Sequence, residues 1–221
     1  MSHSKQGKIT LAELLFTLGI ILLLVWLVLL PMRRHAIEAR QARCRQNLNQ
    51  LAKAMATYLG ECGDNRYLMN PLGPGRKPDD FTGAEWLASL YWTQIIPDPD
   101  VFLCPSTPDT NDNGKDIGRR GPAPTFGSRT VSYAGLHYRS FTGVDGRPLP
   151  VYDDLLPFEP TASDDTEGAL NHGDWGYGGM NVLFFDSHTE FFSRGKLDPL
   201  TAVGATGPPV RAQPLLWRLR N

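Results

Sequence analysis

The stretch TLAELLFTLGIILLLVWLVLL, residues 10–30, is the most apolar part of this 221-residue chain. From Leu14 to Leu30 seventeen residues run without a charge. At a rise of about 1.5 Å per residue, a helix of that length spans about 25 Å, and the flanking apolar residues bring it close to the length of a bilayer-crossing helix. A core helix of a soluble protein normally keeps one polar face, and this run has none. The run therefore predicts a transmembrane helix.

Basic residues flank the run unevenly. Lys5 and Lys8 precede it in a polar leader, and five arginines follow it, at positions 33, 34, 40, 43 and 45. By the positive-inside rule alone, this bias would leave the C-terminal bulk of the chain in the cytoplasm. A removable secretory signal peptide is the other interpretation of the run, but the segment LLPMRRHAIEA offers no small-x-small cleavage site.

A helical pattern continues beyond the apolar run. Between Arg33 and Leu59 the apolar residues are spaced seven, four, three, four and three apart, at Ile37, Cys44, Leu48, Leu51, Met55 and Tyr58. This is a one-sided helical stripe that has to pack against a domain or another subunit. We therefore expect one helix over residues 9–60, about 75 Å long and kinked at Pro31, between a leader (1–8) and a globular domain (61–221).

The N-terminal residues carry a family resemblance. Ile9-Thr10-Leu11-Ala12-Glu13, with a basic leader before it and Pro31 after it, resembles the N-terminus of type IV pilins and type II secretion pseudopilins. The resemblance implies that Glu13 is the fifth mature residue and pairs with the N-terminal amine of a neighbouring subunit during filament assembly. The family's prepilin peptidase cleaves after glycine, but here Lys8 separates Gly7 from Ile9. Cleavage after Gly7 and absence of processing both stay open.

A second resemblance lies near the C-terminus. Two aromatic runs, 181–185 and 188–192, flank Asp186-Ser187 and predict a β-hairpin, in which Ser187 stands where glycine is favoured. A group of bacterial prepilin-like proteins has a similar pattern, matched here by His172, Gly178-Gly179, Asn181-Val182 and Asp186-Ser187-His188. Cys104-Pro105-Ser106, Ser132-Tyr133 and the segment 43–51 also resemble that group. Together the two resemblances imply a pilin-like α+β fold: a long N-terminal transmembrane helix packed on a small antiparallel sheet.

Local signals fill in the rest of the domain. The capping box over residues 82–85 predicts a short helix through Trp92. We expect strands at 101–106 and 130–139, and a surface loop over the Pro-, Asp- and Gly-rich segment 143–170.

The three cysteines make an odd count. Cys44 and Cys62 on one helix would lie about 27 Å apart, too far for a disulfide. Cys62 with Cys104 is therefore the expected pair in an oxidising compartment, with three free thiols as the alternative.

Motifs for chemistry are scarce. No P-loop, Gly-x-Ser-x-Gly or His-Glu-x-x-His occurs. Residues 109–114 match the opening of a calcium loop, but Arg120 replaces the bidentate glutamate, so calcium stays an alternative and no cofactor is expected. The set His172, Asp174, Asp186 and His188 is the one that suggests zinc, yet the hairpin turn accounts for Asp186 and no metal site is predicted.

We therefore expect a structural, non-enzymatic subunit of a type II secretion pseudopilus or type IV pilus-like filament. Its expected partners are the membrane, homologous pilin-like subunits and prepilin peptidase; the net charge of −1 gives no reason to expect nucleic acid. The resemblance implies a single pass through the inner membrane with the C-terminal domain outside the cytoplasm. The alternative is a membrane-tethered extracytoplasmic enzyme or ligand-binding domain.

Overall fold

The structure is a computed structural model that describes residues 10–61, 83–127, 129–136, 157–164, 171–172, 178–193 and 219–220, without the side chains of 30–34 and 220. The chain divides into two compact units, Met1–Ala39 and Arg40–Asn221. The elements are α1 (Leu11–Glu61), α2 (Gly83–Trp92), the 3-10 helix η2 (Pro99–Phe102), and strands β1 (Tyr133–Leu136), β2 (Pro160–Asp164), β3 (Gly179–Phe184), β4 (Thr189–Ser193) and β5 (Leu219–Arg220).

Helix α1 is 51 residues long and takes part in both units. Its helical assignment continues without a break through Pro31. Within the second unit, the predicted stripe is the buried face of the helix: Cys44, Leu48, Leu51 and Met55 are all at most 3% exposed. The stripe belongs to one continuous core with residues of α2, η2 and the sheet. The expected long helix is thus present, and its C-terminal half is part of the domain core.

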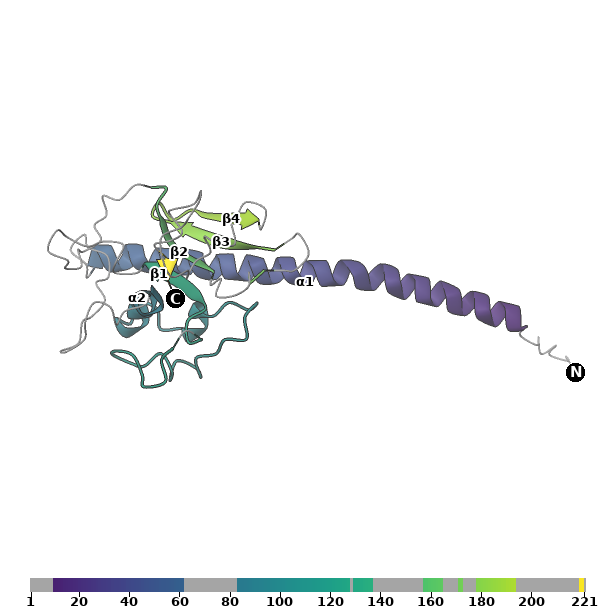
Figure 1. Cartoon of the computed structure of the whole chain (residues 1–221), viewed down its shortest axis with the longest axis horizontal. Helices are drawn as coiled ribbons and strands as arrows, with labels where there is room; N and C mark the ends of the chain where they lie inside the picture. Colours follow the sequence, from purple (N-terminus) through teal and green to yellow (C-terminus); the bar gives the residue numbers. More distant parts are fainter. Residues whose placement is uncertain are drawn as a thin grey trace, which may run out of the picture. The chain divides into compact units, whose positions relative to one another are not determined.

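The sheet is small and entirely antiparallel. Its strand order is β4-β3-β2-β1-β5, and each neighbouring pair is antiparallel (Figure 1). Strands β3 and β4 form the predicted hairpin, with Asn181 opposite Phe191 and Leu183 opposite Thr189. The predicted α+β layout, an apolar N-terminal helix with a small antiparallel sheet, is therefore confirmed.

Both helices pack on the same face of the sheet. Ala162 on β2 is paired with Gly135 on β1 and with Leu183 on β3, and cross-strand partners point to one face. Leu183 meets α1 residues at a small cavity. On the other side of Ala162, Gly135 lies against α2: a Cβ there would stand 2.4 Å from the Gly83 carbonyl oxygen. Gly135 is therefore a glycine because the helix backbone approaches too closely for any side chain.

One central strand lies where a loop was expected. The segment 143–170 was predicted to run over the surface, yet β2 lies in its middle and all five of its residues are buried. The prediction was wrong because Pro160-Thr-Ala-Ser-Asp has a single β-branched residue, Thr161, and no aromatic residue to mark a strand. Pro160 is tolerated because it is the first residue of the strand, where a missing N–H costs little. The small side chains fit a strand that has neighbours on both edges.

A second prediction fails at residues 101–106. The segment was expected to be a strand, but Val101 and Phe102 belong to η2. Asp98 caps this turn by accepting a hydrogen bond from the Asp100 N–H, and Pro99 occupies the first helical position, where its fixed φ is suitable. The cap therefore outweighs the strand preference of a short apolar run. The strand expected over 130–139 is present in the shorter form of β1, and residues 137–139 lie outside the described residues.

Candidate functional site

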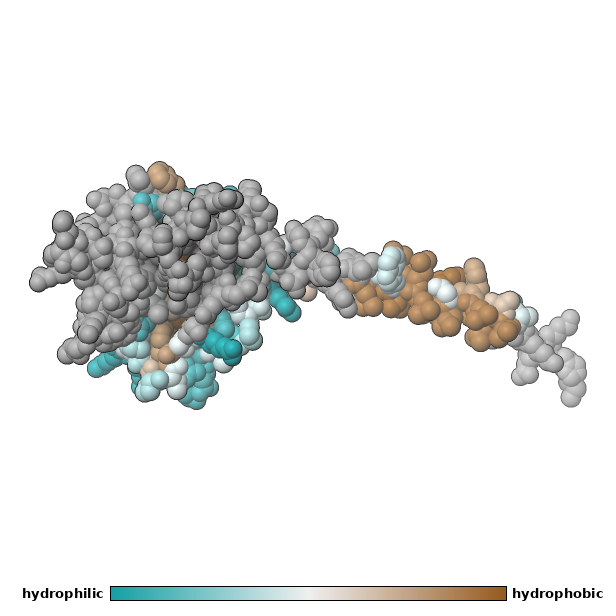
Figure 2. Space-filling model, viewed as in Figure 1, coloured by the Kyte–Doolittle hydropathy of each residue, from teal (hydrophilic) through white to brown (hydrophobic). Residues whose placement is uncertain are grey.

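The first candidate site is the surface of α1 between Leu11 and Leu29. Fifteen large apolar side chains there are between 41% and 74% exposed, and ten of them occupy the consecutive positions 20–29, which cover all sides of a helix. The face of this segment seen in Figure 2 is mostly apolar. Among the described residues this is the one helical segment long and apolar enough to cross a bilayer, a property that N-terminal signal sequences share. An exposed apolar surface of this extent indicates contact with lipid or with other apolar helices.

Glu13 closes a capping box at the start of this helix. The Thr10 N–H donates to Glu13 Oε2 at 2.9 Å, and the Glu13 N–H donates to Thr10 Oγ1 at 3.3 Å. These reciprocal bonds satisfy two backbone donors that the first turn of a helix leaves unpaired. The sequence interpretation considered Glu13 only as an assembly residue. Its carboxylate therefore has a local structural role in addition to the one implied by the family resemblance.

The residues expected at the processing site are not part of the described chain. Gly7, Lys8 and Ile9 all precede the first described residue, Thr10. Their predicted role stays a prediction.

The disulfide joins a different pair of cysteines from the one expected. Cys44 on α1 is bonded to Cys104, which follows η2, with Cα atoms 5.3 Å apart and 60 residues of separation. The predicted Cys62–Cys104 pair is therefore wrong, and Cys62 lies outside the described residues. The sequence placed Cys44 in the apolar stripe, whose side chains face the domain, but it did not identify Cys104 as the partner. A bridge over 60 residues contributes about 4 kcal/mol to the free energy of unfolding in the chain-entropy model.

Two further polar side chains lie against this disulfide. His172 and Asp164 have no exposed side-chain surface, and His172 Nε2 lies 2.9 Å from Asp164 Oδ2. The same nitrogen is 3.9 Å from Cys104 Sγ. Donor atoms of Cys44, Cys104, Asp164 and His172 all lie within 4.8 Å of one another, and all four residues are buried. We call these four residues the buried polar cluster.

Hydrogen bonds from neighbouring residues hold Asp164 and His172 in place. Asp164 is the last residue of β2, and Asn181 lies on the neighbouring strand β3. Asn181 donates to Asp164 Oδ2 through both its backbone N–H, at 2.7 Å, and its side-chain amide, at 3.0 Å. His172 forms an isolated bridge with Gly179 and is also bonded through its Nδ1 to Ser106 Oγ, 3.0 Å away. Asp164 Oδ1 and Asn181 Oδ1 are buried, and neither has a hydrogen-bond partner among the described residues.

Sequence reasoning found only part of this arrangement. His172 was considered as a metal ligand, but with Asp174, Asp186 and His188 as companions. The structure instead pairs His172 with Asp164, while Asp174 lies outside the described residues. Asp164 was missed because it lay in the expected loop.

Burial raises the pKa of the neighbouring Tyr133 phenol well above its ordinary value of 10.0, and the Asp164 carboxylate adds to this rise.

Asp186 and His188 form a separate, exposed pair at the hairpin turn. The His188 N–H donates to Asp186 Oδ1 at 3.1 Å, the imidazole Nδ1 contacts the same oxygen, and the ring stacks on Phe184 with centroids 4.3 Å apart. Burial opposes the charge of Asp186, but these two hydrogen bonds outweigh it and lower its pKa. Contrary to the expected two-residue turn, the loop has three residues, 185–187, because Phe184 pairs with His188. Ser187 has φ +68°.

The calcium-like segment 109–114 forms a compact turn. Asn111, which would be a ligand, is buried and donates to the Pro99 carbonyl at 2.8 Å while its Oδ1 accepts from the Gly114 N–H at 3.2 Å. Asp112 is paired with Lys115 at 3.0 Å. These are the contacts of ordinary turn-forming residues.

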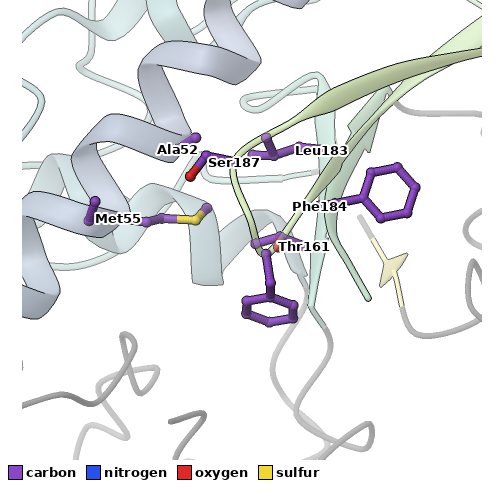
Figure 3. A pocket seen from close by; sticks show the side chains of 8 residues that line it. Ala52, Met55, Thr161, Leu183, Phe184 and Ser187 are labelled. Atoms are coloured by element: carbon purple, nitrogen blue, oxygen red, sulfur yellow. The ribbon is translucent and has the colours of Figure 1, made fainter. Parts of the chain in front are cut away.

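A small cavity lies between α1 and the hairpin. Its volume is about 20 Å³, enough for roughly one water molecule. In Figure 3, Ala52 and Met55 of α1 approach it from one side and Leu183 and Ser187 from the other, while the Phe184 ring points away from Met55. The cavity is too small to bind a substrate or cofactor.

Comparison of the chain with protein-family models, curated proteins and solved structures gave no match.

Proposed function

We propose that this chain is a membrane-anchored structural subunit of the pilin-like class, which assembles through its N-terminal helix into a pseudopilus or pilus-like filament. The proposal rests on one observation: the apolar segment Leu11–Leu29 and the buried stripe of the domain belong to the same continuous helix. A cleavable signal sequence has no reason to continue as a core helix of the mature domain. An anchor built into the fold, by contrast, couples the domain to whatever the apolar surface contacts.

The charge pattern and the disulfide support opposite orientations. The arginines after the apolar segment favour a cytoplasmic domain. A buried disulfide between Cys44 and Cys104 favours an oxidising compartment, because cytosolic thiols are kept reduced. We give the disulfide more weight, since it closes the domain core. The proposal therefore has a single pass through the inner membrane and an extracytoplasmic domain.

In this proposal Glu13 acts in assembly. A carboxylate at the mouth of a lipid-exposed helix costs free energy unless it meets a cation, and the N-terminal amine of a neighbouring subunit would supply one. Lateral contact between apolar helices would account for an all-round apolar surface of this length. No enzymatic role is part of the proposal.

The capping box supports a second candidate function. Because Thr10 and Glu13 satisfy each other, Glu13 has a complete explanation within a single chain. The helix would then be a plain tether for an extracytoplasmic binding or catalytic domain.

One pair of variants separates the two functions. Glu13→Gln removes the charge but keeps a side chain that caps the helix equally well, since glutamine also serves at this position of a capping box. Thr10→Ala removes the cap and keeps the charge. The measurement is chemical cross-linking of full-length protein in its native membranes. The filament proposal expects multimers from the wild type and from Thr10→Ala, but not from Glu13→Gln.

Two results would contradict the filament proposal. One is a wild-type chain that remains uncross-linked in its native membranes. The other is a Glu13→Gln chain that forms multimers as well as the wild type, which would leave the tether as the better account. N-terminal sequencing of membrane-extracted protein tests processing separately: a start at Lys8 or Ile9 supports prepilin peptidase as a partner, and an intact Met1 contradicts it.

A further inference from the structure

We propose that the buried polar cluster is a zinc site that forms when the Cys44–Cys104 disulfide is reduced. Its ligands would be the two thiolates, Nε2 of His172 and a carboxylate oxygen of Asp164. This inference goes beyond the filament proposal and does not depend on it, because every residue it uses lies within the second unit.

The positions of the donor atoms suit tetrahedral coordination. Zinc–sulfur bonds of about 2.3 Å and zinc–nitrogen or zinc–oxygen bonds of about 2.0 Å place the ligand atoms of a tetrahedron about 3.3 to 3.8 Å apart. The four donor atoms of the cluster already lie within 4.8 Å of one another. Once their bond is broken, the two sulfur atoms need to separate only to about 3.8 Å, with the backbone of α1 and the turn after η2 in place.

The surroundings orient the ligands as in known zinc sites. A metal-bound histidine usually donates its second ring N–H to an acceptor that fixes its tautomer. His172 Nδ1 lies 3.0 Å from Ser106 Oγ, which leaves Nε2 directed at Asp164 and Cys104. Asn181 donates twice to Asp164 Oδ2, which fixes the carboxylate. Asp164 Oδ1 has no hydrogen-bond partner although it is buried.

The unpartnered oxygen is the independent sign of a ligand. Burying a carboxylate oxygen without a partner costs free energy, and native proteins rarely leave one in that state. A disulfide beside a buried His–Asp pair is the simpler account of the cluster, but it gives Oδ1 no partner. A metal ion bound through Oδ1 would supply one.

The donor set selects zinc among common ions. Two thiolates exclude magnesium and calcium, which take oxygen ligands. Thiolate sulfur, imidazole nitrogen and carboxylate oxygen are all zinc ligands, and four protein ligands around the ion would give the closed tetrahedral coordination of a structural zinc site. With both thiols and Asp164 ionised and His172 neutral, the bound site carries a net charge of about −1, far less than the ligands alone.

The redox step balances with a dithiol reductant. Thiol–disulfide exchange breaks the bond between the sulfurs of Cys44 and Cys104 and oxidises the reductant to its own disulfide. Two electrons and two protons pass to the protein, which gives two thiols. Zinc then forms two Zn–S bonds and displaces the two thiol protons into solvent, without any change in its own oxidation state.

The test uses the full-length chain in detergent micelles, freed of metal and divided into oxidised and dithiol-reduced samples. With zinc as the only added metal, we expect one zinc per reduced chain and none per oxidised chain. Cobalt added in place of zinc should give the intense visible bands of tetrahedral Co(II) with a thiolate charge-transfer band. X-ray absorption of the zinc form should count two sulfur and two nitrogen or oxygen ligands. These three readouts need no variant, so misfolding of a variant cannot obscure them.

Variants assign the ligands. His172→Gln and Asp164→Asn should each weaken zinc binding by the reduced chain more than tenfold, and Ser106→Ala by about 10- to 100-fold. The matched controls are His188→Gln, from the exposed His–Asp pair, and Cys62→Ser, which removes the third thiol. Neither control should change zinc binding.

The proposal is overturned if the reduced chain binds no zinc, if the oxidised chain binds it equally well, or if the bound zinc has three sulfur ligands. It is also overturned if His172→Gln binds zinc as tightly as His188→Gln does. That result would mean that the thiols bind zinc without the rest of the cluster.

Discussion

Asn181 donates both its backbone N–H and its side-chain amide to a single oxygen, Oδ2 of Asp164, at 2.7 and 3.0 Å. His172 Nε2 lies 2.9 Å from the same oxygen. Asp164, on β2, therefore contacts both Asn181 of β3 and His172. The Asp164 side chain has no exposed surface, so water cannot replace it as the acceptor of the Asn181 backbone N–H. Asp164 therefore accepts hydrogen bonds that link two strands of the sheet.

Replacement of Asp164 by alanine should therefore be costly. In the oxidised chain without added metal, Asp164→Ala takes the acceptor from the buried Asn181 backbone N–H. It also removes the nearest hydrogen-bond partner of the Asn181 side-chain amide and of His172 Nε2. We expect the free energy of unfolding to fall by about 3 kcal/mol. Denaturant titration of the full chain in micelles measures this. The matched control is Asp186→Ala, which breaks an exposed His–Asp pair and should cost less than about 1 kcal/mol. Equal losses for the two variants would contradict the role given to Asp164.

The disulfide assignment predicts which thiol is free. Alkylation of the unfolded but unreduced chain should label one cysteine, Cys62, and alkylation after reduction should label all three. Peptide mass mapping identifies the labelled residue, and a label on Cys44 or Cys104 before reduction would refute the assignment. Cys104→Ser should lower the free energy of unfolding by about 2 to 5 kcal/mol, whereas Cys62→Ser should have little effect.

The hairpin turn carries local backbone strain at Ser187. Its φ of +68° lies in the left-handed region, which costs a residue with a Cβ about 1 kcal/mol relative to glycine. Ser187→Gly should therefore raise the free energy of unfolding by about 1 kcal/mol, measured by thermal or denaturant unfolding. Ser193→Gly, the same change at the end of β4, should instead lower it by about 0.5 to 1 kcal/mol. A destabilised Ser187→Gly variant would be inconsistent with the turn described.

Two glycines should respond to alanine in opposite directions. At Gly135 a Cβ would lie 2.4 Å from the Gly83 carbonyl oxygen and 2.9 Å from Leu87 Cγ. Gly135→Ala therefore has to push α2 away from β1 and should cost about 1 to 3 kcal/mol. At Gly60, in the last turn of α1, a Cβ meets nothing within 4 Å. Gly60→Ala should stabilise the helix by about 0.5 to 1 kcal/mol. Circular-dichroism melts of both variants check the contrast.

The Asp186 pair predicts an acid-sensitive hairpin. The pKa of Asp186 is lowered in the folded chain, so its ionised form stabilises the fold above the unfolded-state pKa of about 3.9. That contribution is lost as the pH falls through the lower folded-state pKa. Below about pH 4 the stability difference between wild type and Asp186→Asn should therefore shrink. NMR titration of the Asp186 carboxyl carbon measures the pKa directly, and a value above 3.9 would reverse the prediction.

Several features followed from local chemistry alone. The capping box at residues 82–85 and the apolar residues after it were enough to predict α2, because caps and helical periodicity act within one or two turns. The aromatic runs on either side of Asp186 predicted the hairpin for the same reason. The stripe that includes Cys44 and Leu48 predicted which face of α1 the domain would cover.

The buried polar cluster could not be predicted in this way, because its four residues lie far apart in the chain. Asp164 and His172 belong to a segment with few strand-forming residues, so nothing local marks β2 as the centre of the sheet. Cys44 was assigned to the helix stripe but not to Cys104, because spacing along one helix excludes partners and does not choose one in another element. Only the folded chain shows which buried donor atoms meet.

By itself the sequence determined the long apolar helix, its buried stripe, the short helix and the hairpin, because these depend on periodicity and on contacts between residues close in the chain. The tertiary structure alone decided the central strand β2, the Cys44–Cys104 bridge and the meeting of Asp164 with His172. Those features depend on contacts between residues far apart in the chain, and the residues of β2 have on their own only a weak preference for any one conformation.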